Sequence, residues 1–128
     1  MLEPLRVGVI GGGTAGAAAA LFLARAGHAV TLFEAVERPG PVGAGIVLQP
    51  TGQSVMARLG LFGPVLDRGA RIDRLRCEST ERRSIVDISY ADVAPGLFGL
   101  GLHRGVLFST LFQAARAEPG VTLALGGE

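Results

Sequence analysis

The chain has 128 residues, of which 48% are hydrophobic and 18% are charged, and its formal net charge is +1 at pH 7. These values fit one globular domain or less, and the nearly neutral charge argues against a nucleic-acid partner, because binding a phosphate backbone requires a basic surface. All 12 basic residues are arginines, which excludes a P-loop lysine and a Schiff-base lysine, while one cysteine and two histidines exclude an internal disulfide and make a closed zinc site implausible.

The first predicted element is a short buried strand over residues 7–10, followed by a tight glycine turn at residues 11–16 (GGGTAG). A helix rich in Ala and Leu is predicted over residues 17–26, and a second strand over residues 29–33 leads to Glu34. Strand, glycine loop, helix, strand and acid, in this order, are typical of a dinucleotide-binding βαβ unit.

Each part of this unit has a chemical reason. Gly11 permits the sharp turn out of the strand, Gly13 leaves room for a pyrophosphate beside the backbone, and Gly16 lets the helix lie close to the strands. The free N–H groups and the positive end of the helix dipole face the phosphates. Glu34, at the end of the second strand, is placed to accept hydrogen bonds from both ribose hydroxyls.

The same stretch resembles a membrane span in length only. Residues 7–24 carry no charge, but the glycines cluster at one end and no basic cluster precedes the run. A buried strand and helix therefore explain it better than a span, and no signal peptide or anchor is expected. We expect a cytoplasmic protein.

The middle of the chain is predicted to contain short elements separated by Gly and Pro. They are a loop at 35–42, a glycine-led strand at 43–48, helices at 50–59 and 61–68, strands at 72–77 and 84–90 joined by the turn 78–83, and a loop at 91–101. The two strands are expected to pair antiparallel, with Cys77 as a small core residue.

The last predicted elements return to the first sheet. Apolar spacing indicates a helix over residues 105–117, and residues 121–125 form a third strand. The right-handed crossover rule places this strand beside the one that ends at Glu34. Three parallel strands make a half-built doubly wound sheet, so we expect the sequence to be the front third of a longer protein.

Three motifs carry a resemblance to a known family. The glycine loop with Glu34 is similar to the FAD-binding fingerprint of the glutathione-reductase-like flavoproteins. GAGIVLQP at residues 43–50 and LHRGVLFSTL at residues 102–111 resemble the flavin-dependent aromatic hydroxylases of the para-hydroxybenzoate and phenazine hydroxylase type, also called class A flavoprotein monooxygenases. The resemblance implies an α/β fold: residues 1–128 would be the N-terminal portion of a Rossmann-like FAD-binding domain, with an antiparallel strand pair at about 70–92 that belongs to the substrate side.

The resemblance also implies residue roles on the adenosine side. The pyrophosphate would be held by Gly11, Gly13, Thr14, Ala15 and Gly16, and the adenosine ribose by Glu34. Arg38 would lie near the adenosine. From the residues alone, Arg38 is more simply a charged loop residue.

On the flavin side, the backbone of Gly45, Ile46 and Val47 would face the isoalloxazine, and Arg104 would reach the ribityl chain or a phosphate. Two simpler interpretations stay open here. The glycines could serve a β-bulge, and Arg104 could be an exposed arginine at a helix start.

The resemblance implies an enzyme that binds FAD, uses NAD(P)H and O₂, and hydroxylates an aromatic or similar small organic substrate. Thr51 and Gly52 stand where the family often has Asn-Ala, and the family's later Asp-Gly and Gly-Asp motifs lie beyond the sequence, so we expect the 128 residues alone to be inactive. No residue is a convincing catalytic acid or base, and His103 is more simply a packed or surface histidine. The alternatives are an NAD-dependent dehydrogenase or flavin reductase of the same fold, and a non-catalytic nucleotide-binding fragment.

Overall fold

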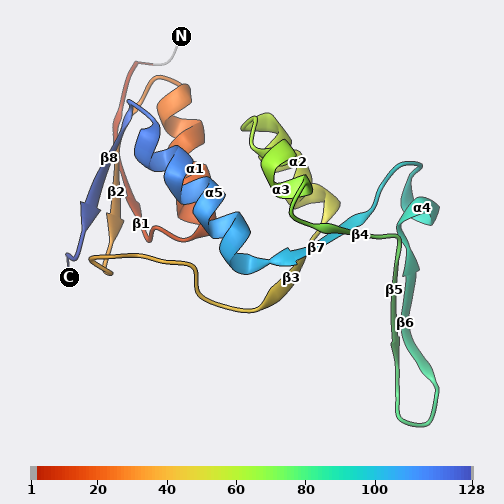
Figure 1. Cartoon of the computed structure of the whole chain (residues 1–128). Helices are drawn as coiled ribbons and strands as arrows, with labels where there is room; N and C mark the ends of the chain where they lie inside the picture. Colours follow the sequence, from red (N-terminus) through yellow and green to blue (C-terminus); the bar gives the residue numbers. More distant parts are fainter. Residues whose placement is uncertain (1–2, 128) are drawn as a thin grey trace.

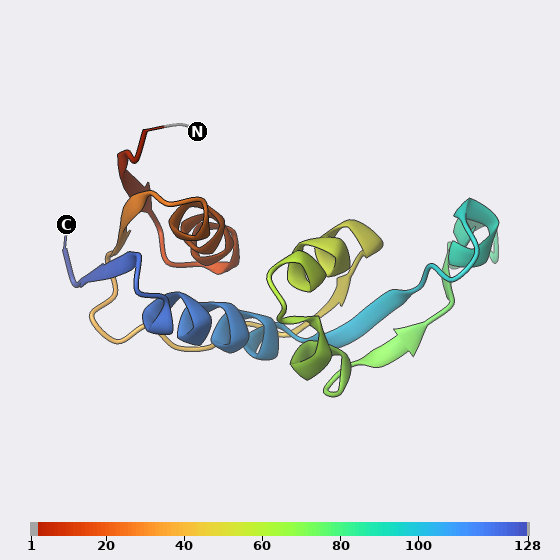
Figure 2. The same cartoon turned by 90° about the horizontal axis from the view of Figure 1, so that it is seen from above.

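The computed structural model describes residues 3–127. Three small sheets lie in a row along an elongated molecule (Figure 1), and the view from above shows the same row (Figure 2). The first sheet is parallel, the second is antiparallel and three-stranded, and the third is a two-stranded hairpin at the far end.

The parallel sheet has the strand order β1-β2-β8. Its elements are β1 (Arg6–Ile10), the crossover helix α1 (Thr14–Arg25), β2 (Ala29–Glu34), the returning helix α5 (Arg104–Ala117) and β8 (Val121–Leu125). Glu34 pairs with Leu125 and Thr31 with Thr122, so the third strand lies beside the one ending at Glu34, as predicted. The Rossmann-like α/β fold is confirmed, in a partial form.

Within residues 3–127, helices cover one face of this sheet. Val30 and Leu32 of β2 are buried under α1 and α5, whereas Phe33, on the opposite face, is 45% exposed and Ile10 is 92% exposed. Val7 and Val9 are half-buried, so the prediction of a buried first strand is wrong for Ile10 and only partly right for the other two. Parallel strands carry apolar residues on both sides when both faces of their sheet are covered. In the part of the chain that the structure describes, only one face of the sheet is covered, so the apolar Ile10 and Phe33 are exposed on the other.

The second sheet has the order β3-β7-β4 and is antiparallel. Its strands are β3 (Gly45–Leu48), β4 (Ala70–Ile72) and β7 (Gly99–His103), and beside them lie α2 (Pro50–Arg58) and α3 (Phe62–Leu66). The predicted loop at 91–101 is wrong at both ends, because a short helix, α4, covers Tyr90–Val93 and β7 begins at Gly99. A Cβ on Gly99 would lie 2.6 Å from the Tyr90 hydroxyl oxygen, so this glycine permits close packing within a strand instead of marking a loop.

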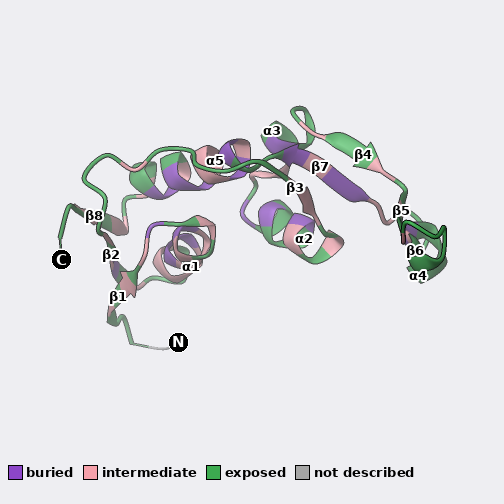
Figure 3. Ribbon diagram, turned by 90° about the horizontal axis from the view of Figure 1, so that it is seen from below, coloured by how far each residue is buried: buried purple, intermediate pink, exposed green. Residues whose placement is uncertain are grey.

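The third sheet is a projecting hairpin of β5 (Arg74–Glu78) and β6 (Ser84–Ser89), followed by the short helix α4 (Tyr90–Val93). The predicted antiparallel pair is present, but Ile72 belongs to β4 and pairs with Gly99 of the second sheet. Cys77 is exposed, so its prediction as a core residue is wrong. Figure 3 shows the hairpin as largely exposed, because the described residues place no layer on it.

The core joins the first two sheets. Leu21 of α1, Leu32 of β2, Met56 of α2, Val65 of α3 and Leu100 of β7 have the largest fully buried side chains. Buried residues therefore gather where α1, α5, α2 and β7 meet (Figure 3). Within residues 3–127, no helix combines the length and hydrophobicity needed to cross a bilayer.

Candidate nucleotide-binding site

The glycine loop closes tightly between β1 and α1. Gly11 has a φ of 98°, a backbone conformation that favours glycine, and its N–H donates to the carbonyl of Phe33 at 2.7 Å. A Cβ on Gly16 would collide with the carbonyl oxygen of Gly11 and would lie 3.5 Å from Cγ1 of Val9. Gly16 thus lets the helix approach the turn itself as well as the strand.

Gly13, unlike the crowded Gly16, has open space beside it. A Cβ at this position would meet no described atom within 4 Å. Gly13 is the N-cap residue of α1, no side chain caps this helix, and the hydrogen bond to the Gly13 carbonyl comes from the N–H of Ala17 at 2.9 Å. The N–H groups of Thr14, Ala15 and Gly16 precede that bond, so the helix offers its first donors to open space, as an anion-binding N-terminus does.

Glu34 lies across the loop from these donors. Its Oε2 accepts a hydrogen bond from the N–H of Gly12 at 2.7 Å, and its Oε1 accepts one from the N–H of Val36 at 2.9 Å. Hydrogen bonds from the Val36 and Gly12 backbones hold the pKa of the Glu34 carboxyl below its ordinary value of 4.5. An ionised carboxylate has about four acceptor positions, so Glu34 keeps capacity for ligand hydroxyls.

Gly12 is a residue of the candidate site that the sequence reasoning missed, because its N–H binds Glu34. A Cβ on Gly12 would lie 3.0 Å from Oε2 of Glu34, so a side chain here would press on the carboxylate. The available signal was the middle glycine in the run from Gly11 to Gly13, which the turn alone does not require.

A cavity of about 650 Å³ opens at the carboxyl ends of the three parallel strands. It is lined by Ile10, Gly11, Phe33, Glu34, Ala35, Ala124, Leu125 and Gly127. Ligands of open α/β sheets bind at this end of the strands. The walls are apolar apart from Glu34, which suits a flat aromatic base joined to a ribose.

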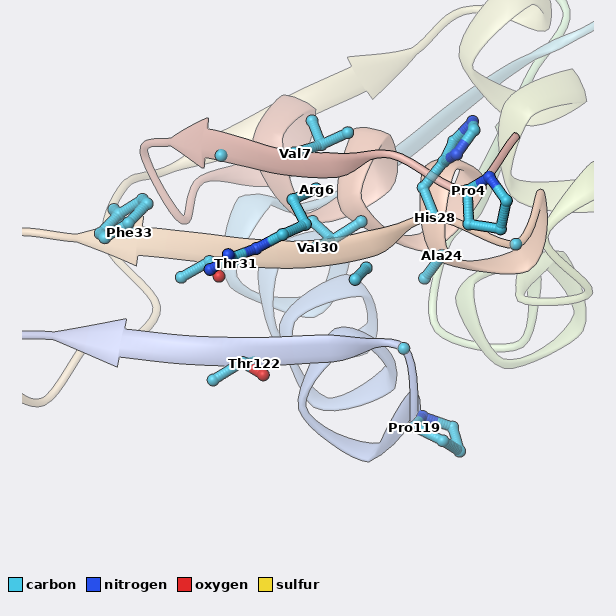
Figure 4. Close-up of a pocket in the computed structure, with 14 residues that line it drawn as sticks. Pro4, Arg6, Val7, Ala24, His28, Val30, Thr31, Phe33, Pro119 and Thr122 are labelled. Carbon is cyan, nitrogen blue, oxygen red and sulfur yellow. The ribbon is translucent and has the colours of Figure 1, made fainter. Parts of the chain in front are cut away.

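A larger hollow of about 800 Å³ lies on the uncovered sheet face, reaching the strand ends near His28 and Pro119 (Figure 4). Thr31, Phe33 and Thr122 are among the residues around it, and α1 and α5 lie behind the strands. None of the residues that line this hollow belongs to the glycine loop or to the start of α1. The smaller cavity, by contrast, includes Gly11 of the glycine loop and Glu34.

The predicted flavin-side residues come together in the second sheet. Gly45 pairs with His103, Ile46 with Leu102 and Val47 with Gly101. Arg104, which begins α5, donates its backbone N–H to the carbonyl of Ala44 at 2.9 Å. The structure therefore brings the two flavin-side motifs into direct contact, although they are far apart in the sequence.

One chain segment links the two parts of the site. The loop between β2 and β3 runs past the start of α5, on the same side of the molecule as the glycine loop (Figure 1). Arg38 lies in this loop and is exposed, and it is not among the residues that line the 650 Å³ cavity.

The residues present fit FAD on three structural observations: open space at Gly13, uncapped donors at the start of α1, and an ionised Glu34 in an apolar cavity. Among the described residues, no group of three or more His, Cys, Asp or Glu side chains could hold a metal ion.

Comparisons with known proteins agree with this geometry. A family model described as FAD dependent oxidoreductase matches residues 6–83. The 3-hydroxybenzoate 6-hydroxylase of Klebsiella oxytoca is 32% identical over 125 residues, which cover 94% of this chain and 32% of the relative. The salicylate hydroxylase of Pseudomonas putida is 37% identical over 111 residues, covering 84% of this chain and 26% of the relative.

Solved structures give the same result. The tetrameric form of 2-methyl-3-hydroxypyridine-5-carboxylic acid oxygenase superposes with a TM-score of 0.81 at 28% identity, covering 99% of this chain and 33% of that one. The chain thus spans about a third of the length of the proteins it resembles. Its family match, its relatives and its glycine-loop geometry show that the chain belongs to the FAD dependent oxidoreductase family, among the class A FAD-dependent aromatic hydroxylases and monooxygenases.

Proposed function

We propose that this chain is the FAD-binding portion of a flavin-dependent monooxygenase that uses NAD(P)H and O₂ to hydroxylate an aromatic or similar small organic molecule. The observation that carries the proposal is the pairing of uncapped α1 donors with an ionised Glu34 tied to the same glycine loop. Phosphates and a ribose are the two groups that this pairing recognises.

The roles of the chain's own residues follow from their positions. The backbone N–H groups of Thr14, Ala15 and Gly16 would hold the pyrophosphate, with Gly11 and Gly13 shaping the turn. Glu34 would accept the ribose hydroxyls, because its carboxylate is already oriented by Gly12 and Val36. Bound FAD supplies the redox and oxygen chemistry, and the protein supplies position and shielding from water.

On the flavin side, the exposed Gly45 backbone and Arg104 would line the path from the pyrophosphate to the flavin ring. Arg104 forms no ion pair within residues 3–127, so its guanidinium is available to a phosphate. Arg38 would meet the adenosine only if its loop closes toward the cavity.

The test is a set of titrations by calorimetry with FAD, FMN, NAD⁺ and ADP. We expect FAD and ADP to bind and FMN, which lacks the adenosine half, to bind far more weakly. Tighter binding of NAD⁺ than of FAD would favour the NAD-dependent dehydrogenase. Equal binding of FAD and ADP with no contribution from Arg104 would favour a nucleotide-binding fragment without flavin contacts.

Turnover is a separate expectation. We expect the 128-residue chain alone to consume NAD(P)H no faster than free FAD does, with or without added phenols. The uncovered face of the parallel sheet and the exposed Gly45 at the start of β3 would leave a bound ring open to water, and an unshielded site loses reactive intermediates. Coupled NAD(P)H consumption and phenol hydroxylation by a monodisperse sample would contradict this expectation.

A further inference from the structure

The start of α5 is held by the loop that precedes β3 through a set of close contacts. A Cβ on Gly43 would lie 2.9 Å from Cδ of Arg104, and a Cβ on Gly105 would lie 2.6 Å from Cβ of Pro41. The N–H of Arg104 donates to the carbonyl of Ala44 at 2.9 Å. We call residues 41–45 and 103–105 the clamp.

His103 closes the clamp from the helix side. It is the N-cap residue of α5, and its Nδ1 accepts a hydrogen bond from the N–H of Gly105 at 3.0 Å. An N-cap side chain that accepts from this position fixes the first turn of a helix. The acceptor must be the unprotonated nitrogen of a neutral imidazole.

The starts of α1 and α5 use their backbone N–H groups differently. Among the helices within residues 3–127, α5 alone has a side-chain cap hydrogen bond. The start of α1 leaves its donors to a ligand, whereas at the start of α5 His103 and Ala44 already use the N–H groups of Gly105 and Arg104. The α5 terminus is therefore organised to hold a side chain in place.

That side chain is Arg104. Gly43 has a φ of 118° and no side chain, so the aliphatic part of Arg104 lies directly against its backbone. With the helix start fixed by His103 and the stem resting on Gly43, the clamp restricts where the Arg104 guanidinium can point. A preorganised arginine loses less conformational entropy when it binds a ligand.

We propose that His103 is a positioning residue, which acts through Arg104 to strengthen binding of the flavin-side half of FAD without touching the cofactor itself. The proposal rests on the proposed function, because it requires Arg104 to meet the ribityl chain of FAD, beyond the two phosphates that ADP shares with it. It predicts that FAD affinity depends on His103 while ADP affinity does not, since ADP occupies only the glycine-loop side.

The experiment compares the parent chain with His103→Ala, His103→Asn and Arg104→Ala. Asparagine is the matched control, because its side chain also caps helices. Amide hydrogen exchange at Gly105 reports on the clamp without any ligand, and calorimetry gives the affinities for FAD and ADP. We expect His103→Ala to speed exchange at Gly105 and to weaken FAD by roughly three- to tenfold, with ADP unchanged and His103→Asn close to the parent.

The outcomes separate the two proposals. If the parent chain binds no FAD, the proposed function fails and the positioning role fails with it, whatever Gly105 shows. If FAD binds and Arg104→Ala weakens it but His103→Ala does not, the positioning role alone is overturned. It is also overturned if His103→Ala weakens ADP equally, which would indicate general destabilisation, or if Gly105 exchange is unchanged.

Discussion

The glycine loop and the β5–β6 hairpin are at opposite ends of the molecule and tolerate change very differently. In the loop, a side chain on Gly16 would collide with backbone, and one on Gly12 would press on Glu34. In the hairpin, all residues from Ser84 to Ile88 are exposed, and Arg74 holds Asp87 with two hydrogen bonds of 2.6 Å on the surface.

This difference indicates where function resides in the chain. Backbone that is constrained by several contacts at once keeps donors and a carboxylate in fixed positions before a ligand arrives. A surface ion pair contributes little to stability, and a two-stranded hairpin alone is marginal in water. The loop end should therefore respond sharply to substitution and the hairpin end weakly.

The largest effect is expected from Gly16→Val. A branched side chain facing the Gly11 carbonyl would push α1 away from the loop, at a cost of about 3 kcal/mol or more in the free energy of unfolding. Thermal unfolding followed by circular dichroism should show a large drop in the midpoint or loss of the cooperative transition. A midpoint within about 2 °C of the parent, roughly the shift that a cost below 1 kcal/mol produces, would show that the helix can move aside.

Gly13→Val should separate binding from folding. The residue has an extended backbone conformation, with φ −70° and ψ −173°, and open space around it, so valine is tolerated in the chain but occupies the place of the pyrophosphate. We expect FAD binding to be lost and the thermal midpoint to stay close to the parent value. Normal FAD affinity in this variant would place the phosphates elsewhere.

Glu34→Arg should abolish FAD binding, because it replaces the ribose acceptor with a bulky donor. Glu34→Gln is the milder companion, and loss of a charged hydrogen bond worth about 1.5–3 kcal/mol corresponds to a tenfold or greater loss of affinity. Calorimetric titration measures both variants. Affinities equal to that of the parent would remove Glu34 from the site.

Acid should weaken the loop through the same carboxylate. The pKa of Glu34 is lowered in the folded chain, so its contribution to stability is present above the unfolded value and is lost as the pH falls through the folded value. Comparing unfolding of the parent and Glu34→Gln, we expect their difference to be constant near neutral pH and to shrink below pH 4.5. A difference that persists unchanged in strong acid would contradict this linkage.

The smallest effects are expected in the hairpin. Cys77→Ser and Val86→Thr change exposed side chains, so each should alter the free energy of unfolding by about 0.5 kcal/mol or less. Chemical denaturation of both variants beside Gly16→Val makes the comparison direct. A loss of 2 kcal/mol or more, well above the usual range for exposed sites, would show that another surface covers the hairpin in solution.

The sequence alone determined the βαβ order and the place of the last strand. Hydrophobic periodicity, glycine spacing and the crossover rule are local or topological constraints, and they correctly placed β8 beside β2. The same reasoning identified Glu34, because an acid at the end of the second strand has a defined position relative to the loop.

Tertiary structure decided the features that depend on contacts between distant residues. The sequence predicted a loop at 91–101, yet β7 pairs with β3 and β4. Tyr90 and Ile72 pack where side chains on Gly99 and Gly101 would lie. Cys77 is exposed because the described residues place no layer over the hairpin. The hydrogen bond from Gly12 to Glu34 and the clamp around Arg104 join segments that no local pattern connects, so only the folded chain reveals them.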